Sequence, residues 1–389
     1  MSSGMTTLPP AVAASFAAIA YETLSQGTMK NSEIYTDLEA RFTFNSSAVQ
    51  GISGSILERI FRHHTPFGCI AKGKTGAFKD HYVLALRGTA KMRDCITDLH
   101  CGVATGPNNQ SVHAGFNQTF NSLKSQLEQY FSQNPTAPVH VVGHSLGGAL
   151  ANLAANWLKQ RFKVPVKLYT FGAPRVGLLS FASHTEHALQ GVYRCVHAGD
   201  PVPMVPVWPF VHTTDEYILN SAPSISPGAH SMTNPTPGYL NTASKYKSYA
   251  DIQKGFELRH QEATRLDFEK RHQAHFSVRW AKKIGAALLD FLNKKGVLHS
   301  IQASVTGLLT IYDAIATYLA NEIETTQTYA AEVKGIVGHM YVFCGLPAGK
   351  FIDFSYRGIR LIFKKMLTKL SQLAKFSIEM ASHTAPLLV

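Results

Sequence analysis

The feature that most constrains the fold is a serine enclosed by glycines between a predicted strand and a predicted helix. Residues 143–147 read G-H-S-L-G, a G-x-S-x-G motif centred on Ser145. A β-branched run at residues 139–142 precedes the motif, and a helix-forming run at residues 148–160 follows it. A strand that turns sharply into a helix needs glycines beside the serine, because larger side chains would clash there. The serine oxygen then lies above the free N–H groups of the helix N terminus, which indicates a nucleophilic serine.

Short apolar runs that end at glycines recur through the first 240 residues. They lie at residues 81–86, 139–142, 166–171 and 193–197, and the segments between them are long enough for crossover helices. Alternating strands and helices are typical of a mostly parallel sheet with helices on both faces. The sequence therefore predicts an α/β fold with a mostly parallel central sheet.

The character of the chain changes near residue 240. Four prolines fall in the loop at residues 221–239, and no proline occurs between Pro237 and Pro347. Strand-like runs give way there to helical periodicity. A length of 389 residues fits two folding units. We therefore expect a catalytic domain at residues 1–240 and a helical accessory domain at residues 241–389, for which membrane association and a lid role are the two hypotheses.

A nucleophilic serine needs a base, a carboxylate that orients the base, and an oxyanion hole. In α/β-hydrolases the acid follows the serine in the chain and the histidine follows the acid. Asp200 lies directly after the predicted strand at residues 193–197, in a G-D-P-V-P turn stiffened by Pro201 and Pro203. Its position and its order in the chain favour Asp200 as the acid.

Several further motifs occur in a fixed order around Ser145 and Asp200. They are R-G-T at residues 87–89, D-L at 98–99, V-H-A-G-F at 112–116, G-H-S-L-G-G-A at 143–149, Y-T-F-G-A-P-R-V-G at 169–177 and D-P-V-P at 200–203. Together they resemble the class 3 lipase family, the fungal-lipase-like α/β-hydrolases, over roughly residues 60–235. The resemblance implies the α/β-hydrolase fold and places Ser145 and Asp200 in a catalytic triad. It also implies an oxyanion hole formed by Thr89 and the backbone N–H of Leu146.

The base is to be chosen among the 18 histidines of the chain. His113, His144 and His197 are among those that precede Asp200 and fail the order, and His212 resembles a non-catalytic histidine of the family. His230 opens the segment H-S-M in a polar loop, which resembles the base motif of the family. That motif usually has a tyrosine soon after it, whereas Tyr239 lies nine residues on. We predict His230 as the base, and His275 remains the alternative.

Two other segments bear on access to the site. Residues 90–110 correspond to the region that holds the lid in related lipases, but few large apolar side chains occur there, so we expect a short or different cover. Near the C terminus, Ile359, Ile362, Phe363, Met366, Leu370 and Leu373 recur at helical spacing among lysines and arginines. Such a helix can lie on an anionic membrane, or it can pack on its own domain with a solvated basic face.

Composition narrows the classes of function that remain. The chain carries 37 Lys and Arg against 25 Asp and Glu, and seven basic against two acidic residues follow position 349. No nucleic-acid motif, phosphate loop or metal-ligand cluster accompanies this charge, so we expect no cofactor, no metal and no nucleic-acid partner. Five cysteines without paired spacing predict no disulfide framework. Residues 1–10 lack the positive flank of a secretory signal, which predicts a cytoplasmic protein, or one exported without a cleaved signal, with peripheral membrane contact.

These observations converge on a serine carboxyl-ester hydrolase acting on lipids, most simply a phospholipase A or a lipase with an acyl-enzyme intermediate. The phospholipid preference depends on the basic C-terminal helix, and a secreted effector is the hypothesis for its setting. Two alternatives remain at this point: an esterase on soluble or plant-derived esters, and a non-catalytic protein that binds membranes or partners. The sequence leaves the oligomeric state open.

Overall fold

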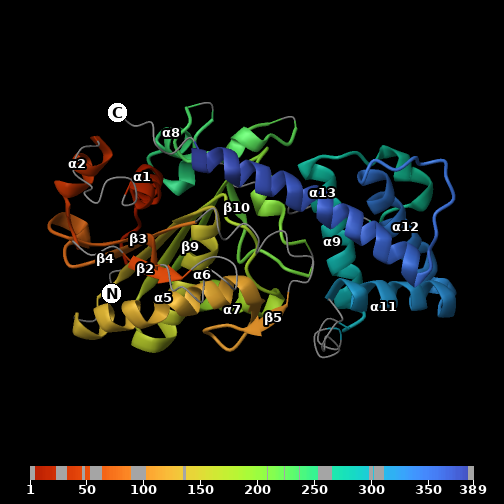
Figure 1. Ribbon diagram of the computed structural model, residues 1–389, viewed down its shortest axis with the longest axis horizontal. Coiled ribbons are helices and arrows are strands. Elements are labelled where there is room, and N and C mark those ends of the chain that lie inside the picture. Colours follow the sequence, from red (N-terminus) through yellow and green to blue (C-terminus); the bar gives the residue numbers. More distant parts are fainter. Residues whose placement is uncertain are drawn as a thin grey trace.

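The predicted β-branched runs lie side by side at the centre of an eight-stranded sheet in the computed structural model (Figure 1). The structure describes residues 5–22, 33–45, 49–52, 64–88, 102–134, 137–207, 209–222, 224–235, 237–252, 265–297, 301 and 311–383. The order of strands is β1-β3-β4-β7-β8-β9-β10, and β2 pairs with β3 beside that path. Their bounds are β1 Phe42–Phe44, β2 Val49–Ile52, β3 His64–Gly73, β4 Tyr82–Arg87, β7 Val139–His144, β8 Val166–Phe171, β9 Gly191–His197 and β10 Glu216–Asn220.

The sheet is parallel from β4 onward and antiparallel at its N-terminal edge. β4, β7, β8, β9 and β10 pair in parallel, whereas β1, β2 and β4 each pair with β3 in antiparallel register. A separate two-stranded ribbon joins β5 (Val103–Thr105) to β6 (Ser111–His113). The carboxyl ends of the parallel strands therefore meet at one edge of the sheet, which confirms the predicted α/β-hydrolase fold.

Both faces of the sheet are buried. In β4 the side chains of Tyr82, Leu84 and Leu86 belong to one apolar cluster, and those of Val83 and Ala85 belong to the other. This division follows from the alternation of side chains along a strand. α5 (Ala114–Gln133) and α6 (Leu146–Phe162) cover the first face, whereas α1 (Pro10–Glu22) and α8 (Tyr239–Ala243) pack over the second. Coverage on both faces explains why the central strands read as nearly continuous apolar runs.

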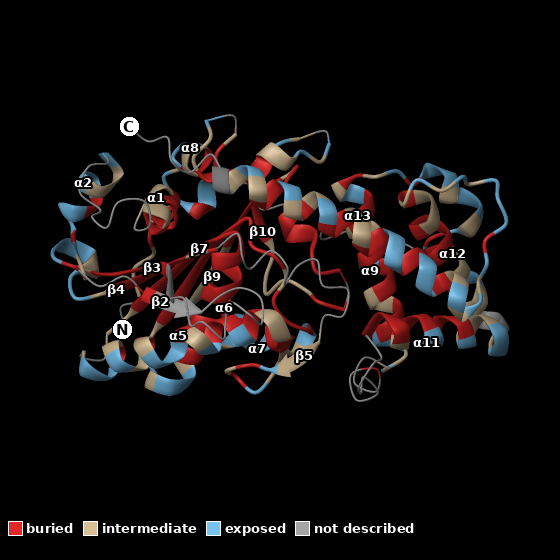
Figure 2. Cartoon of the chain, viewed as in Figure 1, coloured by how far each residue is buried: buried red, intermediate tan, exposed pale blue. Residues whose placement is uncertain are grey.

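The C-terminal part of the described chain is helical, and no described residue after Asn220 lies in a strand. Its longer helices are α9 (Val278–Lys294), α11 (Ile311–Thr325), α12 (Gln327–Phe343) and α13 (Tyr356–His383). They share one apolar cluster with α5, α6 and the sheet, so the two parts of the molecule have a continuous core (Figure 2). Among the described residues, no helix is long and apolar enough to cross a bilayer.

α13 connects the two parts of the molecule. It contacts α11 and α12 in the helical part, and it reaches across the molecule to the short turns η3 (Val202–Met204) and η4 (Pro227–His230) (Figure 1). The predicted apolar positions Ile359, Ile362, Phe363, Met366 and Leu370 are all buried, and Leu373 is half-buried. In this structure the apolar face of the helix therefore packs on the protein itself.

Candidate active site

Ser145 occupies a strained turn between β7 and α6. β7 ends at His144 and α6 begins at Leu146, so the serine alone separates the strand from the helix. The backbone of Ser145 has φ +58° and ψ −134°, a conformation that non-glycine residues adopt only when the surrounding structure imposes it. Its N–H donates to the carbonyl of Phe171 at 2.9 Å, which holds the turn against β8.

The glycines beside Ser145 allow this turn. A Cβ atom on Gly143 would lie 2.3 Å from the carbonyl oxygen of Gly147. A Cβ atom on Gly147 would lie 2.3 Å from the carbonyl oxygen of Leu86 in the neighbouring strand. Both approaches are closer than any side chain tolerates, so the G-x-S-x-G spacing follows from the packing of the helix end against the sheet.

Three side chains form a continuous hydrogen-bonded chain at the carboxyl edge of the sheet. His230 Nε2 lies 2.7 Å from Ser145 Oγ, and His230 Nδ1 lies 2.8 Å from Asp200 Oδ2. Ser145 lies at the end of β7, Asp200 follows β9, and His230 is the last residue of η4. This is the order and geometry of a Ser-His-Asp triad, in which the imidazole bridges the hydroxyl and the carboxylate.

Asp200 accepts two further hydrogen bonds. Its Oδ1 accepts the backbone N–H of Val202 at 2.9 Å, and its Oδ2 accepts the hydroxyl of Tyr239 at 2.7 Å. Burial raises the pKa of Tyr239 well above its usual range, and the negative charge of Asp200 raises it further, so this tyrosine stays a donor. Gly172, with φ +57°, lies directly beside the pair, where a Cβ atom would come within 2.6 Å of Asp200 Oδ2.

The loop after Asp200 is held by two half-buried side chains, Arg175 and His212. Arg175 Nη1 donates to the carbonyls of Met204 and Pro206 at 2.7 and 2.9 Å. His212 Nε2 lies 2.7 Å from the carbonyl of Pro203 and donates to it. Burial and the nearby guanidinium groups lower the pKa of His212 well below its usual range, so this ring is neutral. His212 thus supports the acid turn and does not reach Ser145.

A second histidine lies directly against His230. The His144 ring stacks on the His230 ring with centroids 4.8 Å apart, and His144 Nε2 donates to the His230 carbonyl at 2.9 Å. His144 Nδ1 accepts the hydroxyl of Tyr21 from α1 at 2.8 Å. Burial above all, and then the neighbouring His230, lower the pKa of His144, while burial raises that of Tyr21 to about 12. Both groups therefore stay neutral and orient the His230 ring.

A third histidine supports the same region from β9. The ring of His197 lies parallel to that of Tyr239 with centroids 3.9 Å apart, and the His197 backbone N–H donates to the Tyr239 hydroxyl at 3.0 Å. His197 Nδ1 donates to the carbonyl of Ala229, the residue before His230, at 2.6 Å. Chain order excludes His144 and His197 as bases, and no role is predicted for them from the sequence alone. Their positions, next to Ser145 and at the end of the strand before Asp200, are the sequence signal for a supporting role.

Only one of the two residues predicted for the oxyanion hole, Leu146, lies among the described residues. Leu146 is the first residue of α6, so its N–H is among those without an intrahelical acceptor. Gly88 lies against this helix end, since a Cβ atom on Gly88 would be 3.1 Å from the Leu146 nitrogen. Thr89 and most of the expected lid segment, residues 89–101, lie outside the described residues. Gly88 of the R-G-T motif therefore lies at the N terminus of α6.

The alternative base is remote from this arrangement. His275 is exposed between η7 (Phe268–Gln273) and α9, and its Nδ1 lies 3.2 Å from the carbonyl of Gln273. The hydrogen-bond geometry required of the base is thus found at His230. No group of three or more metal-ligating side chains is close enough to hold an ion within the described ranges.

Comparisons with known proteins show what this chain is similar to. Residues 83–210 match the family described as "Lipase (class 3)". A secreted mono- and diacylglycerol lipase of Fusarium solani is 35% identical over 170 residues, which is 41% of this chain and 50% of that protein. A Vibrio cholerae protein named toxin TseL is 40% identical over 99 residues, 25% of this chain and 15% of its own length. Lipase II of Rhizopus niveus aligns structurally at a TM-score of 0.44 and 27% identity, over 55% of this chain and 80% of that one. The chain spans about half the length of the Fusarium relative.

Proposed function

Because residues 83–210 belong to the class 3 lipase family, we propose that the protein is a serine carboxyl-ester hydrolase acting on lipids. The observation that carries the proposal is the position of the His230 ring, which joins Ser145 Oγ to the Asp200 carboxylate. We assign Ser145 as nucleophile, His230 as base and Asp200 as the orienting acid. The Leu146 N–H and Thr89 are assigned to the oxyanion hole.

The proposed reaction proceeds through an acyl-enzyme. Ser145 Oγ attacks the ester carbonyl while His230 Nε2 takes its proton, and the oxyanion that forms is held by the hole. The tetrahedral intermediate collapses, and the alcohol leaves with the proton from His230. Water then attacks the acyl-serine with His230 again as base, and the fatty acid is released. Asp200 stays ionised throughout and stabilises the imidazolium.

The proposed substrate is a glycerolipid ester at a membrane surface, with a phospholipase A activity preferred. The relatives named as lipases and as a mono- and diacylglycerol lipase support the lipid class. The phospholipid preference is supported by the excess of basic residues on α13, which favours an anionic surface. We propose peripheral membrane contact through this helix and a role as an exported effector, the latter supported by the match to the Vibrio cholerae toxin. Residues 241–389 are proposed as the accessory domain.

The enzymatic proposal is tested by Ser145→Ala. Removing the nucleophile should lower the hydrolysis of short p-nitrophenyl esters by roughly 1000-fold or more, since the residual rate comes from binding and the oxyanion hole. The exposed Ser132→Ala serves as a matched control and should retain the wild-type rate. Vesicle binding should be equal in all three proteins. Equal hydrolysis by wild type and Ser145→Ala would refute an enzyme that uses this serine.

The identity of the base is tested by a pair of histidine variants. His230→Ala should lose activity about as severely as Ser145→Ala, because members of a triad act as a unit. His275→Ala should hydrolyse the same esters at the wild-type rate, since its ring lies outside the triad. A variant set in which His275→Ala is inactive and His230→Ala is active would reverse the assignment.

Product analysis decides between the substrate classes. Purified protein is incubated with a defined phosphatidylglycerol, a diacylglycerol and a soluble acetate ester, and the products are identified by mass spectrometry. Release of a fatty acid and a lysophospholipid from the first substrate supports the phospholipase A proposal. Turnover confined to the diacylglycerol or to the soluble ester would contradict it and favour the lipase or the esterase.

A further inference from the structure

The triad is closed to solvent in this structure. Ser145 is 3% exposed, Asp200 2% and His230 0%. A cavity of about 30 Å³ lies behind Asp200, lined in part by His197, Met204 and Lys282, and it is far too small for an acyl chain. An ester can reach Ser145 Oγ only after a segment that covers the site has moved.

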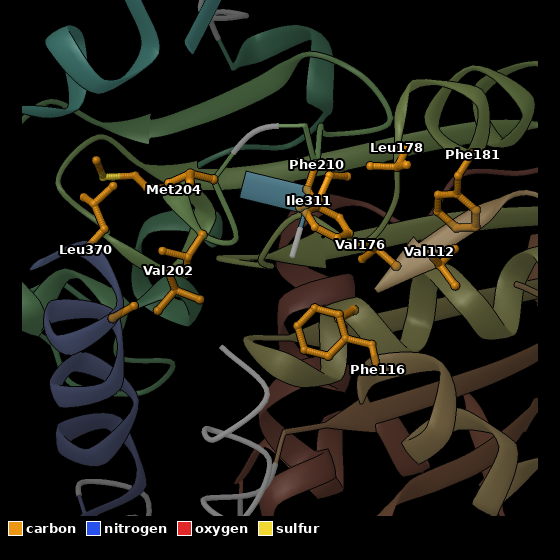
Figure 3. Packing of buried hydrophobic residues seen from close by; sticks show 14 of the residues in the cluster. Val112, Phe116, Val176, Leu178, Phe181, Val202, Met204, Phe210, Ile311 and Leu370 are labelled. Carbon is orange, nitrogen blue, oxygen red and sulfur yellow. The ribbon is translucent and has the colours of Figure 1, made fainter. Parts of the chain in front are cut away.

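α13 packs on the two turns that carry and support the triad. It contacts η4, whose last residue is His230, and η3, which begins two residues after Asp200. The inner face of α13 belongs to the same apolar cluster as η3. Figure 3 shows Leu370 of α13 beside Val202 and Met204 of η3. The C-terminal helix therefore covers the acid and base side of the triad.

The first turns of α13 are tied to the helical part of the molecule instead. Arg360 forms an ion pair with Asp313 of α11, and the Phe363 ring lies 6.2 Å from the Tyr312 ring of the same helix. The carbonyl of Ile362 lies near the thiol of Cys344 at the end of α12. These contacts can hold the start of α13 while the segment beyond it leaves η3 and η4.

The outer face of α13 combines exposed apolar side chains with positive charge. Five large hydrophobic residues are exposed in the described part of the chain, and four of them lie on α13 or just before it: Phe351, Leu361, Phe376 and Met380. The exposed basic residues Arg357, Arg360, Lys364 and Lys365 lie among them. Apolar side chains interspersed with lysines and arginines fit the interface of a bilayer with anionic headgroups.

We propose that α13 is a cover that closes the triad in water and is drawn from it by an anionic lipid surface. The inference rests on the proposed ester hydrolase. A bilayer can shift this equilibrium only if it binds the open state more tightly than the closed one. It does so because the released segment also offers Leu370, Ala374 and Ile378, now buried, to the acyl boundary. The inner face thus packs on the protein when closed and on lipid when open.

The rate at which a fluorophosphonate probe labels Ser145 reports access to the triad independently of the substrate. In the wild-type full-length protein, labelling should be slow in buffer and about tenfold or more faster with phosphatidylglycerol vesicles, since tenfold corresponds to a modest shift of a two-state equilibrium. Phosphatidylcholine vesicles should accelerate it much less. Equal labelling in buffer and with anionic vesicles, in a protein that hydrolyses esters, would overturn the cover and leave the ester hydrolase standing.

Two variants separate the inner contact from general loosening. Leu370→Ala removes packing on η3 and should raise labelling in buffer about tenfold, with a smaller further gain from vesicles. Phe363→Ala removes a buried side chain of α13 that packs on α11 and should label as slowly as wild type in buffer. Identical labelling rates for Leu370→Ala and wild type would overturn the proposal.

The outer face is tested without disturbing the core. Lys364→Glu combined with Lys365→Glu should keep the slow labelling in buffer and lose most of the stimulation by anionic vesicles. The control reverses the same charge at two exposed lysines on other elements, Lys79→Glu with Lys124→Glu, and should keep the stimulation. Loss of stimulation in both double variants would overturn a specific role of α13. If the wild type is labelled under no condition and hydrolyses no ester, the proposed function fails and the cover with it.

Discussion

At the scale of single residues, the surroundings of Asp200 explain a departure from the family pattern. The resemblance predicts a tyrosine soon after His230, whereas Tyr239 lies nine residues on. It is nevertheless Tyr239 that reaches back to Asp200, because the intervening prolines and α8 return the chain to the carboxyl edge of the sheet. Tyr239 also accepts the N–H of His197, so one hydroxyl ties the acid to the end of β9.

We predict that Tyr239→Phe lowers kcat about 10- to 100-fold. The variant removes a hydrogen bond to a charged acceptor, which contributes about 1.5–3 kcal/mol, and leaves Asp200 free to turn away from His230. The ring stays in place over His197, so the melting temperature should change little. Tyr246→Phe is the matched control, since its hydroxyl donates to the carbonyl of Leu219 on β10 and not to the triad. A Tyr239→Phe enzyme with wild-type kcat would contradict this role.

At the scale of elements, a buried ion cluster fastens α9 to the edge of the sheet. Glu216 of β10 pairs with Arg194 of β9 at 3.0 Å and with Lys282 of α9. Burial alone would raise the pKa of Glu216, but the two cations outweigh it and lower the pKa to about 2. Because the folded pKa is depressed, the cluster stabilises the fold above the ordinary pKa near 4.5 and loses that contribution as the pH falls toward 2.

Glu216→Gln should therefore destabilise the protein by about 3 kcal/mol at pH 7, because the buried Arg194 and the half-buried Lys282 lose their carboxylate. Glu128→Gln breaks a comparable glutamate–arginine pair, with Arg161, where both side chains are substantially exposed, and should cost about 0–1 kcal/mol. Urea unfolding of both variants measures the difference. Equal losses in the two variants would show that burial does not set the strength of the cluster.

The strands around Ser145 were predictable because each combines β-branched residues with a glycine turn, and the observed β7 and β8 begin at the predicted residues. The mostly parallel sheet and the family resemblance are confirmed. By contrast, the ion cluster of Glu216 joins elements 66 residues apart, and local periodicity carries no information on such a pair. The amphipathic pattern of α13 predicted a helix with one apolar face, but it could not say that η3 and η4 lie under that face.

At the scale of the whole molecule, buried neutral histidines are distributed through both parts of the fold. His140 bridges His81 and Tyr169 beneath the sheet, His144 and His197 support the triad, and His339 lies in α12. Burial is the main cause that lowers the pKa of each of these four rings. The folded protein therefore takes up fewer protons than the unfolded chain when the pH falls below about 6.5, the ordinary pKa of histidine.

We accordingly predict that the free energy of unfolding is flat above pH 7 and falls as the pH drops from 6.5 to 5. Burial lowers the pKa of His140 to about 3, so between 6.5 and 3 this ring costs about 1.4 kcal/mol for each pH unit. In urea titrations at pH 7 and pH 5, His140→Gln should lose about 2 kcal/mol less than wild type over the interval, since it lacks that protonation. His275→Gln, at an exposed position, should follow the wild-type decline. A wild-type protein whose stability is the same at both pH values would show that these rings accept protons in the folded state. The neutral state of His144, whose ring stacks on that of the proposed base His230, would then be wrong as well.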